Sequence, residues 1–241
     1  MLGLSAQHHS WRWKAVGKHP AAADYIHVGD STPLMEALAD WMTKGYDQWQ
    51  RSRPNSHEPC SWRFWLRGAQ KGQLICGVGR DSSDRIGRPF PLLVVGEGPL
   101  KEWELRWPLL PSRLAKTWGR IERFAVHHYE DLKALADALG QLEAPGQEGE
   151  AADPGMESAG GDPWQACQAD LRRSGRAIVA LNDSGGMDSS QTALSWHAGL
   201  KACCDDIPRA VFLGGSPRQA YLAVILQPLG TADFVRLWSV A

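Results

Sequence analysis

Asp81-Ser82-Ser83-Asp84-Arg85-Ile86-Gly87-Arg88-Pro89-Phe90-Pro91 lies between two apolar runs, at 74–78 and 92–95. The apolar runs predict β-strands, so the charged residues fall on the connection between the two strands. Two aspartates and two arginines are more charge than a turn needs, and loops held on a rigid scaffold often carry binding residues. This connection is therefore the first candidate for a functional site.

The residues around this connection predict an antiparallel meander. The aromatic-rich run at 61–67 is the first strand, and the runs at 73–79 and 91–96 are the second and third. Short connections join the three strands, as is usual for antiparallel neighbours.

Helices are expected before and after the meander. Thr32-Pro33 with Glu36 gives the start signals of an amphipathic helix over 33–51. Further helices are expected at 111–124, 129–142, 163–174, 217–226 and 231–238, and further strands at 176–181, 192–196 and 209–213. Because helices and strands come in blocks without sustained βαβ alternation, we expect an α/β fold: a single domain with a mostly antiparallel sheet flanked by helices in an α-β-α sandwich.

Composition and charge exclude several classes of protein. The 241 residues carry a formal net charge of −1, which recruits neither nucleic acid nor an anionic membrane. No apolar run approaches the roughly 20 residues that cross a bilayer, and residues 1–13 lack an apolar core of signal-peptide length. We therefore expect a cytoplasmic protein without membrane insertion.

The cysteines and tryptophans are distributed along the chain without the spacing of a metal or cofactor site. Five cysteines without CxxC spacing argue against a disulfide framework and against a zinc site built on such pairs. Twelve tryptophans are spread from Trp11 to Trp238; each taken singly is expected to anchor the core, and together they favour a partner surface. Neither residue type predicts a cofactor or a metal.

The segment 144–163 predicts a break in the chain. It holds acids, glycines and prolines but no basic or aromatic residue, which is typical of a solvated linker or loop. The residues after it, 164–241, offer too few strands for a core of their own. We expect them to complete the sheet, so that 1–241 is one domain.

Ser184-Gly185-Gly186-Met187-Asp188-Ser189-Ser190 matches the SGGxDS loop of the ATP pyrophosphatase family. Glycines after a strand let the backbone approach an anion closely. However, only 51 residues follow, Asp183 and Asp188 lie beside the proposed anion, and no lysine occurs before Lys201. A Gly-rich turn is the alternative interpretation, and nucleotide binding here is the second hypothesis for function.

No other group of residues predicts catalysis. His8-His9 and His127-His128 are adjacent pairs, and neighbours in a helix or strand do not share a face well enough for metal ligation by one pair. No GxSxG elbow selects a Ser/His/Asp set. We therefore expect a protein that is not an enzyme.

Three ordered motifs carry a family resemblance. Gly17-Lys18-His19-Pro20 precedes Asp24-Tyr25-Ile26, Trp62-Arg63-Phe64 follows the first helix, and Ser82 to Leu92 spells SSDRIGRPFPL. In this order the motifs resemble the TagF (ImpM) family of type VI secretion-associated proteins, over about 16–140. Ala23 and Pro89 depart from the family pattern, which usually has glycine and often an aromatic at these positions.

The resemblance implies a function. Members are understood as cytoplasmic, post-translational repressors of type VI secretion, linked to the forkhead-associated scaffold protein and to a threonine kinase/phosphatase branch. None is known as an enzyme. For this chain the resemblance implies a non-enzymatic regulator that binds an apparatus component, with the forkhead-associated protein as the expected partner.

The motifs supply the candidate partner-binding or motif residues. They are Lys18, Pro20, Asp24, Asp84, Arg85, Gly87, Arg88, Phe90 and Pro91. An Asp84–Arg85 ion pair would fix the connection, Gly87 would supply a positive φ or a close approach, and the planar fork of Arg88 suits a carboxylate or phosphate. Whether Arg85 and Arg88 hold the fold or hold a partner is left open by the sequence.

Overall fold

The structure, a computed structural model, describes residues 11–52, 58–146, 162–181, 199–201, 204 and 206–240. The strands are β1 (Arg12–Gly17), β2 (Ile26–Gly29), β3 (Ser61–Arg67), β4 (Gln73–Arg80), β5 (Leu92–Pro99), β6 (Arg176–Leu181), β7 (Ala210–Gly215) and β8 (Ala220–Ile225). The helices are α1 (Pro33–Arg51), the 3₁₀ helix η1 (Glu104–Leu109), α2 (Leu110–Val126), α3 (Leu132–Gly140), α4 (Asp162–Ser174) and α6 (Thr231–Ser239).

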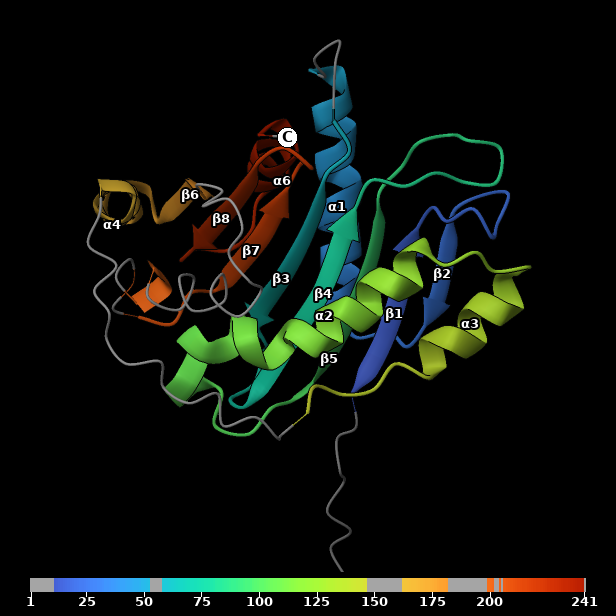
Figure 1. The fold of residues 1–241 in the computed structure, drawn as a ribbon, viewed down its shortest axis with the longest axis horizontal. Helices are drawn as coiled ribbons and strands as arrows, with labels where there is room; N and C mark the ends of the chain where they lie inside the picture. Colours follow the sequence, from blue (N-terminus) through green and yellow to red (C-terminus); the bar gives the residue numbers. More distant parts are fainter. Residues whose placement is uncertain are drawn as a thin grey trace, which may run out of the picture.

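The described strands form one eight-stranded sheet in the order β2-β1-β5-β4-β3-β7-β8-β6 (Figure 1). Every neighbouring pair is antiparallel. The C-terminal strands extend the same sheet, because β7 pairs with β3 and β8 joins β7 to β6.

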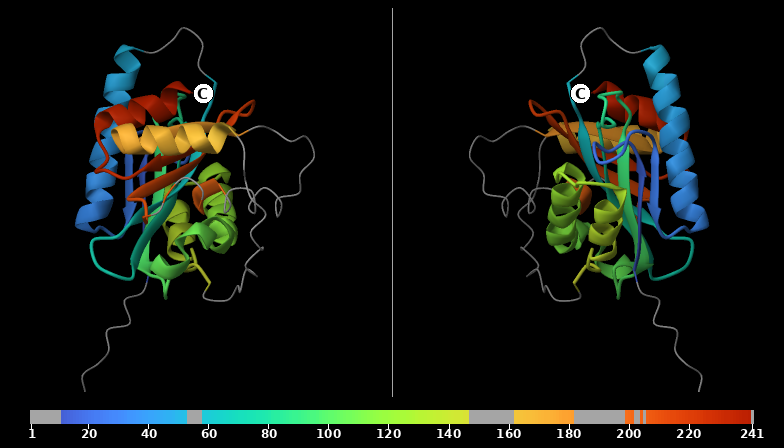
Figure 2. Two further views of the ribbon diagram at one scale, coloured as in Figure 1. Left: turned by 90° about the vertical axis from the view of Figure 1, so that its left-hand side faces the viewer. Right: turned by 90° about the vertical axis from the view of Figure 1, so that its right-hand side faces the viewer.

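Helices cover both faces of the sheet, as the side views show (Figure 2). On one face α1 and α6 bury a core that includes Met35, Trp49 and Phe234. On the other face α2, α3 and α4 bury a second core that includes Trp65, Trp118 and Leu171. The predicted fold class is therefore confirmed, since a mostly antiparallel sheet is flanked by helices within one domain.

Local signals explain where α1 begins. The Thr32 hydroxyl accepts the Met35 amide N–H at 3.2 Å, and Pro33 occupies the first turn. The helix then buries one stripe of its surface against the sheet.

In the segment 217–226 the structure differs from the sequence prediction. It was expected to be a helix, but Ala220–Ile225 is strand β8, and Leu222 to Ile225 are all buried. A short apolar run does not distinguish a fully covered strand from a buried helix by periodicity, and pairing on both sides with β7 and β6 favours the strand. Strands β1 and β2 were not expected at all.

Two other predictions concern segments that are only partly described. The expected linker 144–163 overlaps the start of α4, and its residues 147–161 lie outside the described residues. The expected bend and strand over 184–196 also lie outside them. Within the described part of the chain, no helix is both long enough and apolar enough to span a membrane.

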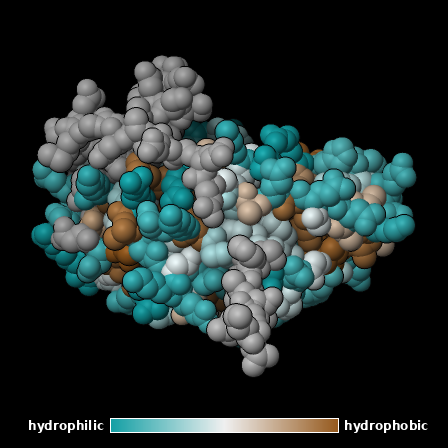
Figure 3. All heavy atoms as spheres, turned by 90° about the horizontal axis from the view of Figure 1, so that it is seen from below, coloured by the Kyte–Doolittle hydropathy of each residue, from teal (hydrophilic) through white to brown (hydrophobic). Residues whose placement is uncertain are grey.

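The described tryptophans belong to the interior. The buried ones are Trp13, Trp49, Trp62, Trp65, Trp103, Trp107, Trp118 and Trp238. Trp11, Trp41 and Trp164 are partly buried, so none of the tryptophans described is exposed, and they act as core anchors rather than as a partner surface. Seen from below, the described residues form a surface on which hydrophilic and apolar residues are mixed (Figure 3).

Candidate functional site

The candidate site lies at one end of the sheet, where two loops meet. The β1–β2 loop (residues 18–25) and the motif loop between β4 and β5 (residues 81–91) project side by side from this end (Figure 1). They meet because β1 pairs with β5, so that Gly17 lies opposite Leu92 and the Lys18 amide donates to the Pro91 carbonyl at 3.3 Å. A Cβ on Gly17 would lie 2.0 Å from the Pro91 oxygen, so this close approach requires glycine.

The carboxylate of Asp84 is the centre of the site. Its side chain is 0% exposed. Oδ1 accepts the backbone N–H groups of Ile86 at 3.2 Å and of Arg88 at 2.9 Å. Oδ2 accepts the Arg88 Nε–H at 2.6 Å and lies 3.1 Å from Lys18 Nζ. These four contacts fold the motif loop around one buried charge.

The environment of Asp84 fixes its ionisation. Burial alone would raise the pKa of the carboxyl group, but the hydrogen bonds from the Arg88 backbone, Lys18 and the Arg88 side chain outweigh burial. The pKa of Asp84 therefore lies well below its usual range, and the group stays a carboxylate at neutral pH.

Arg85 and Arg88 tie the motif loop to the β1–β2 loop. The Arg85 amide donates to the Ala22 carbonyl at 2.8 Å, and its Nη2 donates to the Ala21 carbonyl at 2.5 Å. Arg88 Nη2 donates to the Ala23 carbonyl at 2.7 Å. The expected Asp84–Arg85 ion pair is therefore wrong, because Lys18 and Arg88 take that role and Arg85 satisfies backbone carbonyls instead.

The outer surface of the two loops stays accessible. The Arg88 side chain is 50% exposed and lies 3.6 Å from Asp24, whose own side chain is 81% exposed. Pro20 and Gly87 are exposed, and Ile86 is 70% exposed at the tip of the motif loop. Gly87 has a φ of +84° with no atom within 4 Å of a Cβ position, so it supplies the positive φ and not a close approach.

Phe90 and Pro91 face inward and anchor the base of the motif loop. The Phe90 ring packs edge-on against Tyr25, at a centroid distance of 5.1 Å, and against Tyr46 of α1, at 4.9 Å. Its amide donates to the Ser82 carbonyl at 3.1 Å, and Pro91 is buried. The nine candidates thus divide into an interior set and an exposed set that the interior set holds in place.

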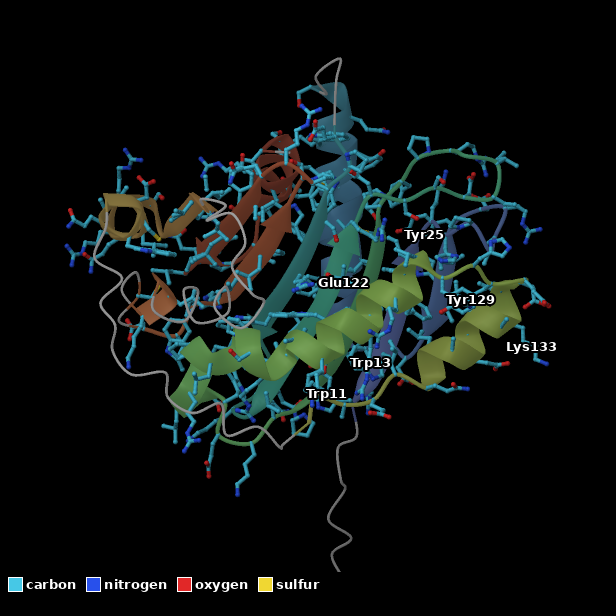
Figure 4. All side chains as sticks on the ribbon, in the orientation of Figure 1. Trp11, Trp13, Tyr25, Glu122, Tyr129 and Lys133 are labelled. Carbon is cyan, nitrogen blue, oxygen red and sulfur yellow. The ribbon has the colours of Figure 1, made fainter. Side chains whose placement is uncertain are left out.

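Sequence reasoning missed two residues of this site, His19 and Ile86. His19 is 1% exposed; its Nδ1 accepts the Ala21 amide at 3.1 Å, and its ring lies 5.5 Å from that of Tyr129, beyond α2. Figure 4 shows Tyr25 and Tyr129 at this same end of the molecule. The signals were present in the sequence: His19 stands inside the first motif, and Ile86 is a lone apolar residue among charges.

Burial shapes the chemistry of His19. Its pKa is lowered from 6.5 to about 4, first by burial and then by His128, Arg80 and His127. The imidazole is therefore neutral at physiological pH, as its acceptor role at Nδ1 requires. His19 serves to shape the β1–β2 loop.

Asp81 at the start of the motif loop has an architectural role. Its carboxylate accepts the Cys60 amide at 2.9 Å and the Trp238 indole N–H at 2.9 Å. The loop is thereby connected to β3 and to the last helix, α6.

The other chemical candidates are less defined. Among the described residues, no three His, Cys, Asp or Glu side chains are grouped so that they could hold a metal ion. His8-His9 and the Ser184–Ser190 loop lie outside the described residues.

Comparisons with known proteins bear on the family and the fold. The family model described as TagF N-terminal domain, type VI secretion system-associated, matches residues 15–144, which include both loops of the site. The crystal structure of PA0076 from Pseudomonas aeruginosa PAO1 is similar in fold, with a TM-score of 0.57 and 19% identity, covering 94% of this chain and 93% of that one. No curated protein matches the sequence.

Proposed function

The chain belongs to the TagF family of type VI secretion system-associated proteins, and from this premise we propose that it is a non-enzymatic cytoplasmic regulator. In this proposal it represses type VI secretion post-translationally by binding a component of the apparatus. The partner we propose is the forkhead-associated scaffold protein, which the resemblance of the three motifs implies.

The observation that carries the proposal is the rigid presentation of Ile86. An apolar side chain that is 70% exposed stands on a loop whose backbone is held by the buried Asp84 carboxylate. A loop backbone that is already held in place costs little entropy on binding, and arginine is enriched at interface hot spots. The half-exposed Arg88 lies on the same loop as Ile86.

The same geometry favours binding over catalysis. The Asp84 carboxylate accepts hydrogen bonds at both oxygens and has a pKa well below its usual range, so it is a poor general base at neutral pH. The hydrogen bonds of Arg85 and Arg88 are directed to backbone carbonyls and to Asp84. These groups are suited to holding a surface in one shape.

A pull-down with the forkhead-associated protein tests the proposal. We expect wild type to retain the partner and Arg85→Ala/Arg88→Ala to lose it. The matched control is Arg12→Ala/Arg67→Ala, which removes two exposed arginines at the opposite end of the same sheet. Failure of wild type to bind, or full binding by Arg85→Ala/Arg88→Ala, would contradict the proposed surface.

Nucleotide binding at 184–190 remains the alternative hypothesis. It predicts that titration with ATP and Mg²⁺ gives heat that disappears in Gly185→Val. The regulator hypothesis predicts the same isotherm before and after this substitution.

A further inference from the structure

A second surface feature is a cleft of about 400 Å³ on the α2 face of the sheet. It lies where β3 begins and where β4 and β7 end, and Glu122 of α2 borders it. The side chains and backbone that matter to its chemistry are those of Ser61, Arg63, Arg80, Glu122, Gly215 and Ser216.

One row of the sheet forms the floor of the cleft. The strand registers place Arg80 opposite Ser61 and Ser61 opposite Gly215, so these residues from β4, β3 and β7 lie in line. Gly215 has a φ of +135°, and a Cβ there would lie 2.4 Å from the Gln219 carbonyl oxygen. Glycine is thus required where β7 turns away beside the cleft.

The two arginines of the cleft differ in their partners. Arg63 forms a two-pronged ion pair with Glu122 of α2, with Nε–Oε1 at 2.6 Å and Nη2–Oε2 at 2.9 Å; Figure 4 labels Glu122 on α2 over the sheet. Arg80 has one hydrogen bond, from Nε to the Asp81 carbonyl at 3.3 Å. Within the described residues, the two terminal nitrogens of Arg80 have no hydrogen-bond partner.

Among the described residues, no acidic side chain forms an ion pair with Arg80. Glu122 is engaged by Arg63, and the Asp81 carboxylate is engaged by the Cys60 amide and the Trp238 indole. Arg80 lies near enough to the buried His19 to contribute, after burial and His128, to lowering the pKa of that imidazole. The Nε2 atom of His19 is itself buried without a hydrogen-bond partner among the described groups.

From these observations we propose that the cleft binds a phosphate group, with Arg80 as its principal ligand. The guanidinium fork of Arg80 matches two phosphate oxygens, and the hydroxyls of Ser61 and Ser216 line the same cleft and can donate to a third. The ion pair between Arg63 and Glu122 fixes the side of the cleft where α2 packs on β3. The Cys60 thiol in the lining is neutral, because burial raises its pKa, so the cleft is suited to binding and not to nucleophilic attack.

This inference is independent of the proposed function. The cleft opens beside β3 and β7, away from the tip of the motif loop, and its ligand can be sought without any secretion component. Phosphate could be supplied as the free ion, on a nucleotide or on a phosphorylated side chain. All three ligands present the same phosphate oxygens to the cleft, and titration with each kind of ligand distinguishes them.

Two-dimensional amide NMR with the full chain tests the site. Inorganic phosphate, a nucleoside monophosphate and a phosphothreonine peptide would be titrated separately, with acetate as a carboxylate probe. We expect saturable shifts at Ser61, Arg80 and Gly215, and an affinity at least about tenfold weaker in Arg80→Gln, because a charge-assisted pair of hydrogen bonds is lost. Arg12→Gln, at the opposite end of the sheet, should bind as wild type does.

The outcomes separate the possibilities. The phosphate probe that binds with the highest affinity shows whether the ligand is the free ion, a nucleotide or a phosphorylated side chain. Weaker binding of acetate than of phosphate supports phosphate as the class of ligand. No saturable binding of any phosphate probe, equal binding of acetate, or unchanged binding by Arg80→Gln would each overturn the proposal. Unchanged unfolding of Arg80→Gln, measured by circular dichroism, ensures that a loss of binding comes from the missing guanidinium.

Discussion

The Lys18 ammonium and the Asp84 carboxylate form a 3.1 Å ion pair in which the Asp84 side chain is fully buried. The pair joins two motifs that are far apart in the sequence into one structural unit. Arg88 completes the unit through its 2.6 Å contact with the same carboxylate. The exposed residues beside it are positioned by this unit, since the Ile86 amide donates to Asp84 Oδ1 and Asp24 lies 3.6 Å from Arg88.

Removing the charge of Asp84 should loosen this unit. In Asp84→Asn, Lys18 and Arg88 lose their shared anion, so we expect a Tm lower by several degrees and weaker binding of the partner. Asp24→Asn is the matched control, because the exposed Asp24 should leave the Tm unchanged. Equal thermal stability of the two variants would contradict the central role of Asp84.

A comparison of Gly87→Ala with Gly72→Ala distinguishes the effect of backbone strain from an effect on partner binding. The φ values of the two glycines are +84° and +79°, and neither has an atom within 4 Å of a Cβ position. Alanine at either position should lower the unfolding free energy by about 1 kcal/mol, because the left-handed conformation is costly for a residue with a Cβ. Only Gly87→Ala should also weaken partner binding; an equal loss in Gly72→Ala, between β3 and β4, would place the contact elsewhere.

Protonation of His19 should destabilise the fold. Its pKa in the folded protein is about 4, below the 6.5 of the unfolded chain, so the stabilisation is complete above pH 6.5 and is lost as the pH falls towards 4. The difference corresponds to up to about 3 kcal/mol. Urea unfolding across this range should show the decline, and His19→Gln, which does not titrate, should show a flatter curve. A variant with the same slope as wild type would refute this assignment.

The contact between α1 and α6 gives a fourth prediction. A Cβ on Gly45 would lie 2.4 Å from Phe234 Cβ, whereas a Cβ on Gly119 of α2 has only Arg123 Nη1 nearby, at 3.8 Å. Gly45→Ala should therefore destabilise by about 1–3 kcal/mol through overpacking. Gly119→Ala should instead stabilise by about 0.5–1 kcal/mol, because alanine favours a helix interior. Chemical denaturation measures both values, and stabilisation by Gly45→Ala would contradict the close packing of α1 on α6.

Parts of the fold with local signals could be predicted from the sequence. Helix α1 was placed correctly because Thr32, Pro33 and a regular apolar stripe act within the segment itself. The strands of the meander were placed for the same reason. Strand β8 was mistaken for a helix, since its last four residues are buried without alternation and its identity is decided by pairing with β7 and β6.

The site was only partly predictable. The motif residues could be named from the sequence, but their partners depend on the pairing of β1 with β5. The sequence indicated β5 but not β1. Lys14 helps to explain why β1 was missed: this charged residue is buried within the strand, where it pairs with Glu36 of α1 at 2.6 Å. Contacts of this kind are set by tertiary packing and leave no local pattern.

The affinity of the forkhead-associated protein for Ile86→Ser tests the central claim most directly. Ile86 and Leu105 are both exposed apolar residues, at 70% and 82%, but Leu105 belongs to η1 and not to the motif loop. Measured by isothermal titration calorimetry, Ile86→Ser should bind at least about tenfold more weakly than wild type, as expected for loss of an interface anchor, while Leu105→Ser should bind as wild type does. Wild-type affinity in Ile86→Ser, or an equal loss in Leu105→Ser, would contradict the assignment of the motif loop as the docking surface.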